Sequence, residues 1–314
     1  MSERCTAIVK QSGCSPESMI RESNPKLLRV THQPHARGWM HYFEANAITN
    51  GQESLATQAL FLVAHPDDET IGASAALSHF PNSVVIYVTD GAPHDQRFWS
   101  SFRGSREAYA RLRLQEAKTA LALAGITSQR IMSLGAADQD SIYEVPILAE
   151  KLLAILRWFR PALVITHPYE GGHPDHDAAA LVANISRRCL QREHRSTPVF
   201  LEMTSYHARD GRCQTGEFLP DSTGTSEPIL TIELSPEEKA KKQKMMEHFA
   251  SQGQVLQGFP IGPERLREAR EYDFARPPHE GPLWYELLGW PMRGEHWREM
   301  AVQAFQAFGE SLCA

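Results

Sequence analysis

The most informative segment of this chain is residues 60–70, with the sequence Leu60-Phe61-Leu62-Val63-Ala64-His65-Pro66-Asp67-Asp68-Glu69-Thr70. An unbroken apolar run that ends in a turn signal is typical of a fully buried strand in a parallel sheet. The Ala- and Leu-rich residues 69–80 that come next predict a helix. His65, Asp67 and Asp68 are therefore expected at the carboxyl end of a central strand, where open α/β sheets bind ligands.

The acidic residues of this turn indicate a bound cation. Three neighbouring carboxylates repel one another unless a positive group lies among them. Calcium and magnesium prefer shells made of oxygen alone, whereas His65 followed by Asp68 offers both nitrogen and oxygen. The pattern therefore favours a transition metal.

A second cluster of the same kind occupies residues 171–177, Gly-Gly-His-Pro-Asp-His-Asp. It follows an apolar run, residues 162–166, and comes before an Ala- and Leu-rich stretch that predicts a helix over residues 177–190. Both clusters therefore lie in strand-to-helix turns on one edge of a parallel sheet. We expect the two turns to meet and to share the metal.

The rest of the pattern alternates between strands and helices, which indicates an α/β protein. We predict a Rossmann-like, mostly parallel sheet with helices on both faces. The expected strands are 60–64, 83–89, 131–135, 162–166, 198–203 and 228–234, and the expected helices are 69–80, 105–125, 146–159, 177–190 and one that opens at Ser235. Residues 210–226 are rich in Gly, Asp, Thr and Ser, and predict a loop.

Three regions follow from composition along the 314 residues. Residues 1–55 are polar and mixed and read as an N-terminal extension packed on the core. Residues 56–255 hold the alternating pattern and form the expected core domain. Residues 256–314 are dense in Trp, Tyr, Pro and Arg, which is not the composition of a disordered tail, so we expect them to pack on the core or over the mouth of the site.

Composition also narrows the function. The net charge of −6 gives no basic footprint for nucleic acid. No apolar run approaches the roughly 20 residues of a membrane span, and the first residues lack the apolar core of a signal peptide, so a cytoplasmic location is expected. Five cysteines without a Cys-x-x-Cys pair give no disulfide framework. The usual nucleotide-binding and serine-hydrolase motifs are missing from the sequence.

The two clusters together, Ala64-His65-Pro66-Asp67-Asp68-Glu69 and His173-Pro174-Asp175-His176, resemble the PIG-L or LmbE-like family of zinc-dependent N-deacetylases. The resemblance covers about residues 58–252. Members of that family remove acyl groups, chiefly acetyl from N-acetylglucosamine units, in glycolipids, thiol glycosides, chitooligosaccharides and antibiotics. The resemblance implies a small-molecule or glycolipid N-acyl amino sugar as the substrate.

The family pattern also implies roles for individual residues. His65, Asp68 and His176 would be the ligands of Zn²⁺, and their two nitrogens and one oxygen leave a coordination position open for water. Asp67 would be the general base that takes a proton from that water. Either Asp67 or His173 would protonate the leaving amine, and the sequence leaves this choice open.

Four further residues receive roles from the same resemblance. His173 would stabilise the oxyanion, and Asp175 would orient the His173 ring. Arg113 would hold the substrate, although an ordinary ion pair with Glu116 explains it equally well. Asp138 would hydrogen-bond sugar hydroxyls.

Other functions remain open at this stage. The same ligands could hold Fe(II) for oxygen chemistry, although the α/β pattern argues against it. A related amidase could cleave a larger acyl group, and a non-catalytic metal-binding relative would keep the fold alone. The sequence does not name the substrate or say whether the protein forms a homo-oligomer. For His167 we expect a structural hydrogen bond.

Overall fold

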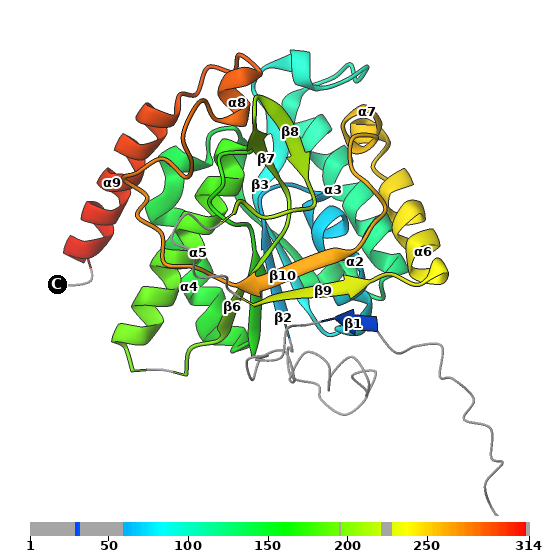
Figure 1. Cartoon of the computed structure of the whole chain (residues 1–314), viewed down its shortest axis with the longest axis horizontal. Helices are drawn as coiled ribbons and strands as arrows, with labels where there is room; N and C mark the ends of the chain where they lie inside the picture. The colour runs from blue at the N-terminus through cyan, green and yellow to red at the C-terminus, as the bar shows by residue number, and fades with distance from the viewer. Residues whose placement is uncertain (1–28, 32–58, 195, 221–227, 312–314) are drawn as a thin grey trace, which may run out of the picture.

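A computed structural model describes residues 29–31, 59–194, 196–220 and 228–311 (Figure 1). The described residues form one eight-stranded sheet and one two-stranded hairpin. The large sheet contains β1 (Arg29–Thr31), β2 (Ala59–Val63), β3 (Val84–Pro93), β4 (Ile131–Asp138), β5 (Leu163–Thr166), β6 (Val199–Met203), β9 (Ile229–Glu233) and β10 (Glu264–Glu268). The hairpin consists of β7 (Tyr206–Arg209) and β8 (Arg212–Thr215).

The strand order of the large sheet is β1-β9-β10-β6-β5-β2-β3-β4. The five strands from β6 to β4 run parallel, whereas β10, β9 and β1 pair antiparallel. The mostly parallel sheet that the sequence predicted is thereby confirmed. After β2 the chain builds outward through β3 and β4, and then returns to place β5 on the other side of β2. Ligands bind beside such a reversal, at the carboxyl ends of the strands.

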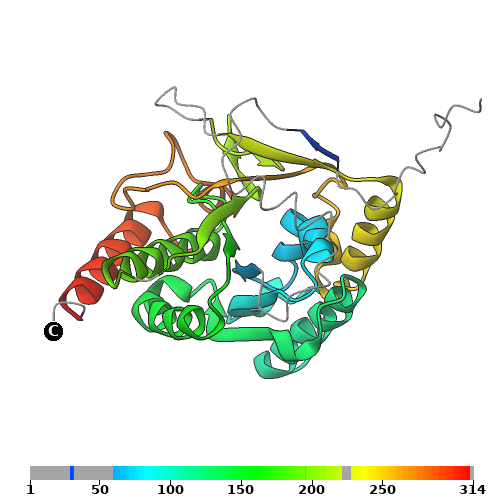
Figure 2. The same cartoon turned by 90° about the horizontal axis from the view of Figure 1, so that it is seen from below.

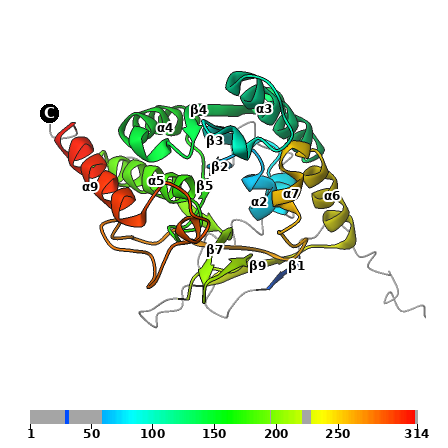
Figure 3. The same ribbon diagram turned by 90° about the horizontal axis from the view of Figure 1, so that it is seen from above.

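Helices cover both faces of the sheet, as predicted (Figures 2 and 3). One face carries α2, α3 and α6, and the other carries α4, α5 and α9. The helices are α2 (Asp68–His79), α3 (Arg106–Leu123), α4 (Val145–Phe159), α5 (Pro174–Arg192), α6 (Pro236–Glu247), α7 (Gly253–Leu256), α8 (Trp284–Leu287) and α9 (Gly294–Ser311), with short 3-10 turns η1 (Gln96–Phe98), η2 (Ser128–Arg130), η3 (Ser141–Glu144) and η4 (Ala250–Gln252). No helix in the described ranges is both long and apolar enough to cross a membrane.

The central strand β2 shows why its sequence is apolar without interruption. Leu60 and Leu62 pack into the core beneath α4 and α5, whereas Phe61 and Val63 pack into the core beneath α2 and α3. Successive side chains of a strand point to opposite faces, so a strand covered on both sides needs apolar residues at every position.

Helix α5 begins earlier than the sequence predicted. Its first residue is Pro174 rather than Asp177, and the ring of His173 caps it by accepting the N–H of Asp175 at Nδ1, 3.1 Å away. Proline is favoured in the first turn because it has no N–H to satisfy. Asp175 and His176 therefore lie on a helical turn with fixed backbone geometry.

The C-terminal part of the chain contributes to the sheet itself. Strand β10 lies between β6 and β9, so residues 264–268, beyond the expected core boundary at 255, belong to the large sheet. Its sequence, Glu-Arg-Leu-Arg-Glu, gave no strand signal because its buried residues include charged ones. Strand β1 pairs with β9, and the rest of the expected N-terminal extension lies outside the described residues.

Candidate metal centre and active site

The two predicted turns meet at the floor of a cavity of about 420 Å³, a size typical of small-molecule sites. His65 follows β2, Asp138 ends β4, and His173 and His176 follow β5 at the start of α5. The β7–β8 hairpin, α7 and α8 surround this end of the sheet (Figure 1). The cavity therefore lies at the reversal of strand order where a ligand is expected.

Asp68 lies between the two imidazoles that the sequence assigned to the metal. One carboxylate oxygen is 3.3 Å from Nδ1 of His65, and the other is 3.2 Å from Nε2 of His176. The three residues offer ligand atoms that all lie within 4.8 Å of one another, and all three are buried. Two nitrogens and one oxygen at this spacing suit a catalytic zinc ion.

The second nitrogen of each imidazole has a hydrogen-bond partner, as is usual for a histidine that binds a metal. Nε2 of His65 is 3.0 Å from Asp175, and Nδ1 of His176 is 3.2 Å from the hydroxyl of Ser205. Ligating histidines in metalloproteins usually have such a partner on the second nitrogen, which fixes the ring and its tautomer. The donor set thus has the outer hydrogen bonds that a metal site requires.

A second set of donors shares His65. It consists of His65, Asp138, His173 and Asp175, again within 4.8 Å. Asp175 is already engaged, because one oxygen accepts the backbone N–H of Gln139 and the other accepts the backbone N–H and the hydroxyl of Ser141. Nδ1 of His173 is engaged as the helix cap. In the set around Asp68, one carboxylate oxygen accepts the backbone N–H of His65 at 2.8 Å, and the other faces Nε2 of His176. One oxygen therefore remains for an ion, which makes this set the better metal site.

The carboxylate of Asp175 contacts a different ring from the one expected. It bonds to His65, whereas its nearest oxygen is 3.8 Å from Nδ1 of His173. The reason is the helical cap, in which the backbone N–H of Asp175 occupies that nitrogen. His173 is still held by Asp175, but through the main chain.

Asp67 has a backbone conformation that is rare for a residue with a side chain, with φ at 140°. Arg113 donates to its carboxylate at 3.1 Å and to the carbonyl groups of Pro66 and Gly91, each at 2.8 Å. Burial raises the pKa of Asp67 to about 7, although Arg113 acts in the opposite direction. The side chain of Asp67 is thus fixed beside the candidate metal site.

Arg113 is only 3% exposed, although it lines the cavity. The structure shows it in contact with Asp67 and two carbonyl groups, and substrate contact stays a prediction. Glu116 accepts the backbone N–H and the hydroxyl of Ser251 instead of pairing with Arg113. The alternative reading as an ordinary surface ion pair is therefore wrong.

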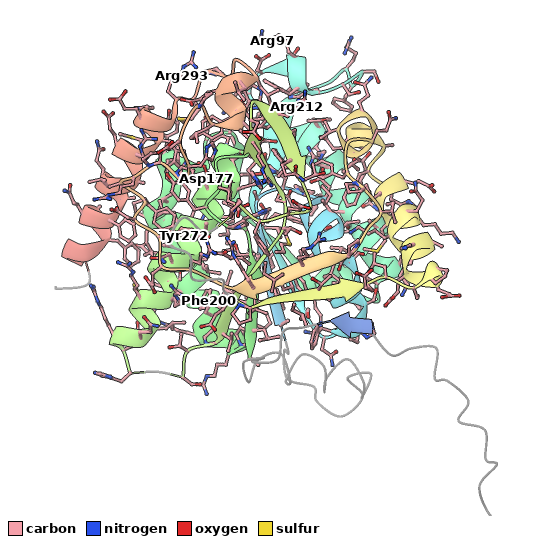
Figure 4. The ribbon with its side chains drawn as sticks, in the orientation of Figure 1. Arg97, Asp177, Phe200, Arg212, Tyr272 and Arg293 are labelled. Atoms are coloured by element: carbon pink, nitrogen blue, oxygen red, sulfur yellow. The ribbon has the colours of Figure 1, made fainter. Side chains whose placement is uncertain are left out.

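His167 has the structural hydrogen bond that we expected. Its Nε2 accepts the N–H of Ala64 at 3.1 Å, and its ring stacks on His176 with 4.0 Å between centroids. It is fully buried behind the candidate ligands. Asp177, also buried at the start of α5, accepts the N–H groups of Glu170 and Gly171 and so fixes the loop between β5 and α5 (Figure 4).

The charges of the cluster depend on burial and on neighbouring groups. Burial lowers the pKa of His176 to about 4, against the attraction of Asp68. Burial also lowers the pKa of His65, but the surrounding carboxylates, Asp138 first, outweigh this effect and hold it well above its ordinary value. Burial raises the pKa of Asp68, but His176 and His167 outweigh it and hold that pKa well below the usual range.

Two aromatic residues near the cluster were not predicted as part of the site. Tyr206, the first residue of β7, packs its ring against His176, and Trp290 packs its ring edge-on against His173. In the loop after β3, Phe98 lines the cavity, whereas Trp99 is buried and donates to the carbonyl of Pro93. The polar sequence around Tyr206 held no strand signal that could have placed it here.

Comparison with known proteins identifies the central region. Residues 60–185 match the family model described as PIG-L: GlcNAc-PI de-N-acetylase. Residues 60–185 thus resemble the PIG-L family. Both halves of the candidate metal site, and all the residues to which the sequence assigned a role, fall within these matched residues.

One curated protein and two solved structures also resemble this chain. A 1D-myo-inositol 2-acetamido-2-deoxy-alpha-D-glucopyranoside deacetylase of Thermomonospora curvata is 29% identical over 143 residues, which are 37% of this chain and 48% of that protein. The chain therefore matches about half the length of that relative. A deacetylase from the biosynthesis pathway of teicoplanin, solved as a bog complex, has a TM-score of 0.52 at 17% identity and covers 69% of this chain and 99% of its own. A triple mutant of a teicoplanin-pathway deacetylase has a TM-score of 0.51 at 18% identity, with the same coverage of both chains. These structures share the fold.

Proposed function

We propose that this protein hydrolyses the N-acetyl group of an N-acetylglucosamine-type sugar, carried in a glycoside or glycolipid, and that it requires zinc. The observation that carries the proposal is the convergence of His65, Asp68 and His176 on one point of the cavity floor, with Asp67 adjacent. The PIG-L match and the T. curvata relative support an amide of an amino sugar as the target.

His65, Asp68 and His176 would hold the ion. When bound there, zinc would supply a Lewis acid for the amide carbonyl and would lower the pKa of a coordinated water towards about 7. The remaining steps belong to side chains of this protein.

Asp67 acts as the general base and takes a proton from the attacking water. Arg113 donates to Oδ2 of Asp67, which leaves Oδ1 for the water and fixes the direction of the transfer. As the carbon–nitrogen bond breaks, Asp67 returns its proton to the leaving amine. A base fixed in this way contributes about 10²- to 10⁴-fold to the rate.

His173 donates a hydrogen bond to the oxyanion that forms during the attack. Its Nδ1 accepts the N–H of Asp175, so in the neutral ring the proton must reside on Nε2. Nε2 is 3.8 Å from Asp138, which places it on the cavity side. Asp138 is proposed to bind a sugar hydroxyl from the same side, and Arg113 to steady the substrate through Asp67.

The experiment that tests the proposal measures carboxylate and free amine released by the zinc-loaded full-length protein from a panel of glucosaminides, some with an N-acetyl group and some with a longer N-acyl group. Matched samples contain protein treated with a chelator, and the Asp67→Asn variant. We expect equal amounts of acetate and amine from the loaded protein alone. Absence of both products from every member of the panel would show that the proposal is wrong, and release of only longer acyl groups would favour the amidase alternative.

A further inference from the structure

The cavity divides into a polar floor and an apolar upper part. Every lining residue that carries a charge or an imidazole belongs to the floor. Among the described residues, the rest of the lining is mainly apolar, notably Phe98, Val255, Phe259, Trp284, Leu288 and Trp290, with the uncharged polar side chains of Gln139, Thr215 and Gln252 among them. A ligand that fills the whole cavity therefore meets polar groups at one end and apolar groups at the other.

Two chains of aromatic contacts lead outward from the floor. On one side, Tyr206 packs against His176 at 5.1 Å between centroids, and Phe259 packs against Tyr206 at 5.6 Å. These contacts continue the wall from the candidate metal site towards α7.

The other aromatic chain starts at the second histidine of the floor. Trp290 packs edge-on against His173 at 4.8 Å, and Phe98 packs edge-on against Trp290 at 5.5 Å. Both chains of rings line the cavity and begin at histidines of the proposed reaction centre, and they are called the two aromatic walls below.

Aliphatic side chains at the mouth extend these walls. Val255 at the end of α7 is 59% exposed, and Leu288 at the end of α8 is 47% exposed. Exposed apolar groups that line a cavity are typical of a surface that a ligand covers. The aliphatic carbons offer no hydrogen-bond partner, so a substrate that placed sugar hydroxyls here would lose its bonds to water without replacement.

We propose that the amino sugar hydrolysed here carries an apolar alkyl or aryl group, which lies between the two aromatic walls and against Val255 and Leu288. The proposal rests on the deacetylase function proposed above and adds the class of substrate. The apolar group can be the aglycone at the glycosidic position, which keeps the N-acetyl group proposed above, or a long acyl chain on nitrogen, which would replace the acetyl group as in the amidase alternative. Either would leave the polar floor through this part of the cavity.

The test uses two series of substrates and the zinc-loaded full-length protein. One series consists of N-acetylglucosaminides with methyl, butyl, hexyl and octyl aglycones, and the other of methyl glucosaminides with acetyl, butanoyl, hexanoyl and octanoyl groups on nitrogen. N,N'-diacetylchitobiose serves as a polar compound of similar size. Released amine gives kcat/KM in both arms.

We expect kcat/KM to rise by roughly threefold for each added methylene over the first few members of one series, as for burial of a methylene from water. The series that rises identifies which end carries the apolar group. If acetate is released but neither series rises, or if the chitobiose compound matches the octyl glycoside, the apolar-group inference is wrong and the deacetylase proposal stands. If no compound is hydrolysed, the deacetylase proposal itself fails.

Two neighbouring leucines of α8 provide matched variants. Leu288 lines the cavity, whereas Leu287 does not and is 42% exposed. We expect Leu288→Ser to lower the octyl-to-methyl ratio of kcat/KM by about threefold to tenfold, and Leu287→Ser to leave it within about twofold. An unchanged ratio in Leu288→Ser would contradict the placement of the apolar group.

A binding measurement separates recognition from turnover. Titration calorimetry with the preferred octyl compound uses protein made inactive by Asp67→Asn. Binding to Asp67→Asn should show a negative heat-capacity change, which indicates burial of apolar surface. The double variant Asp67→Asn/Leu288→Ser should bind the octyl compound with lower affinity. Equal affinity for methyl and octyl compounds would overturn the inference without reference to the rate.

Discussion

At the scale of single residues, Asp67 combines an unusual backbone with a carboxylate that is held in place. A φ of 140° in a residue other than glycine costs on the order of 1–3 kcal/mol and persists only where the surroundings enforce it. Arg113 provides that enforcement, since it bonds both to the carboxylate of Asp67 and to the preceding carbonyl group. The strain is consistent with a residue placed for chemistry.

The Asp67→Asn variant separates the base from the ligands. The amide has nearly the same shape and still accepts from Arg113, but it cannot take up a proton. We expect the variant to bind zinc as the wild type does and to lose roughly a hundredfold or more in kcat. Metal content measured by elemental analysis, together with kcat on the preferred glycoside, checks this expectation.

Asp68→Asn and His176→Ala provide the contrast to that variant. Both should lose zinc, because each removes one of the three proposed ligands. An Asp67→Asn enzyme of near wild-type kcat would remove Asp67 from its role, and full zinc content in both ligand variants would show that the assigned donor set is wrong.

At the scale of elements, a loop of two glycines fixes the start of α5. A Cβ atom on Gly172 would lie 2.0 Å from the carbonyl oxygen of Tyr206, which belongs to the backbone of β7. Gly171 has a φ of +70°, and a Cβ atom there would lie 2.6 Å from the side chain of Leu283. The hairpin and α8 can thus approach the candidate site only because these two positions lack side chains.

The Gly172→Ala variant measures that close approach. Backbone cannot move aside as a flexible side chain can, so we expect a loss of about 3 kcal/mol in the free energy of unfolding. Gly262→Ala is the control, because its Cβ would meet nothing within 4 Å, and it should stay within about 0.5 kcal/mol of the wild type. Chemical denaturation gives both values, and equal stability of the two variants would contradict the expected clash.

A buried ion pair joins three other elements. Glu264 of β10 accepts a hydrogen bond from the ammonium group of Lys242 of α6 at 3.0 Å. It also accepts hydrogen bonds from the hydroxyl of Ser74 and the backbone N–H of Ala75, both in α2. Lys242 is only 2% exposed. Lys242 can be buried because its partner comes from another element, strand β10.

Removal of one partner of this pair should be costly. Lys242→Met leaves a buried carboxylate without its counter-charge, and we expect a loss of about 3–5 kcal/mol in the free energy of unfolding. The exposed Lys244→Met should change it by less than about 0.5 kcal/mol. Addition of Glu264→Gln to Lys242→Met should recover part of the loss, and the absence of any recovery in a double-mutant cycle would argue against charge as the cause.

The elements that the sequence predicted well are those with a local signal. Strands β2, β3 and β5 begin with unbroken apolar runs, and the clusters around His65 and His173 are conspicuous because they follow such runs. Strand β10 was missed because its charged residues predict an exposed segment. Glu264 and Arg267 are in fact buried, since each pairs with a residue of another element: Glu264 with Lys242 and Arg267 with Glu202. Tyr206 and Trp290 were missed as site residues for the same reason, since only the folded chain brings their rings against the histidines.

At the scale of the whole molecule, metal binding is expected to stabilise the fold. The three proposed ligands come from two connections that are about a hundred residues apart in the chain, so zinc would bind the folded state far better than the unfolded one. Zinc at a hundred times its dissociation constant would add about 2.7 kcal/mol. We therefore expect a chelator to lower Tm by several degrees and zinc to restore it.

The ligand variants again supply the control for this measurement. Asp68→Asn and His176→Ala should show the same Tm with zinc and with chelator in a thermal melt. A wild-type Tm that does not respond to zinc would contradict the proposed site, whatever the enzyme does to a substrate.

The position of β10 has a consequence for biosynthesis. A ribosome makes the chain from its N-terminus, so β6 and β9 are synthesised before β10, the strand that pairs with both of them. Until residue 268 has been translated, each of those two neighbours presents an unsatisfied edge that invites pairing with other polypeptides. A nonsense mutation after residue 255 would thus yield not a smaller enzyme but an aggregation-prone product, even though every proposed zinc ligand had already been made.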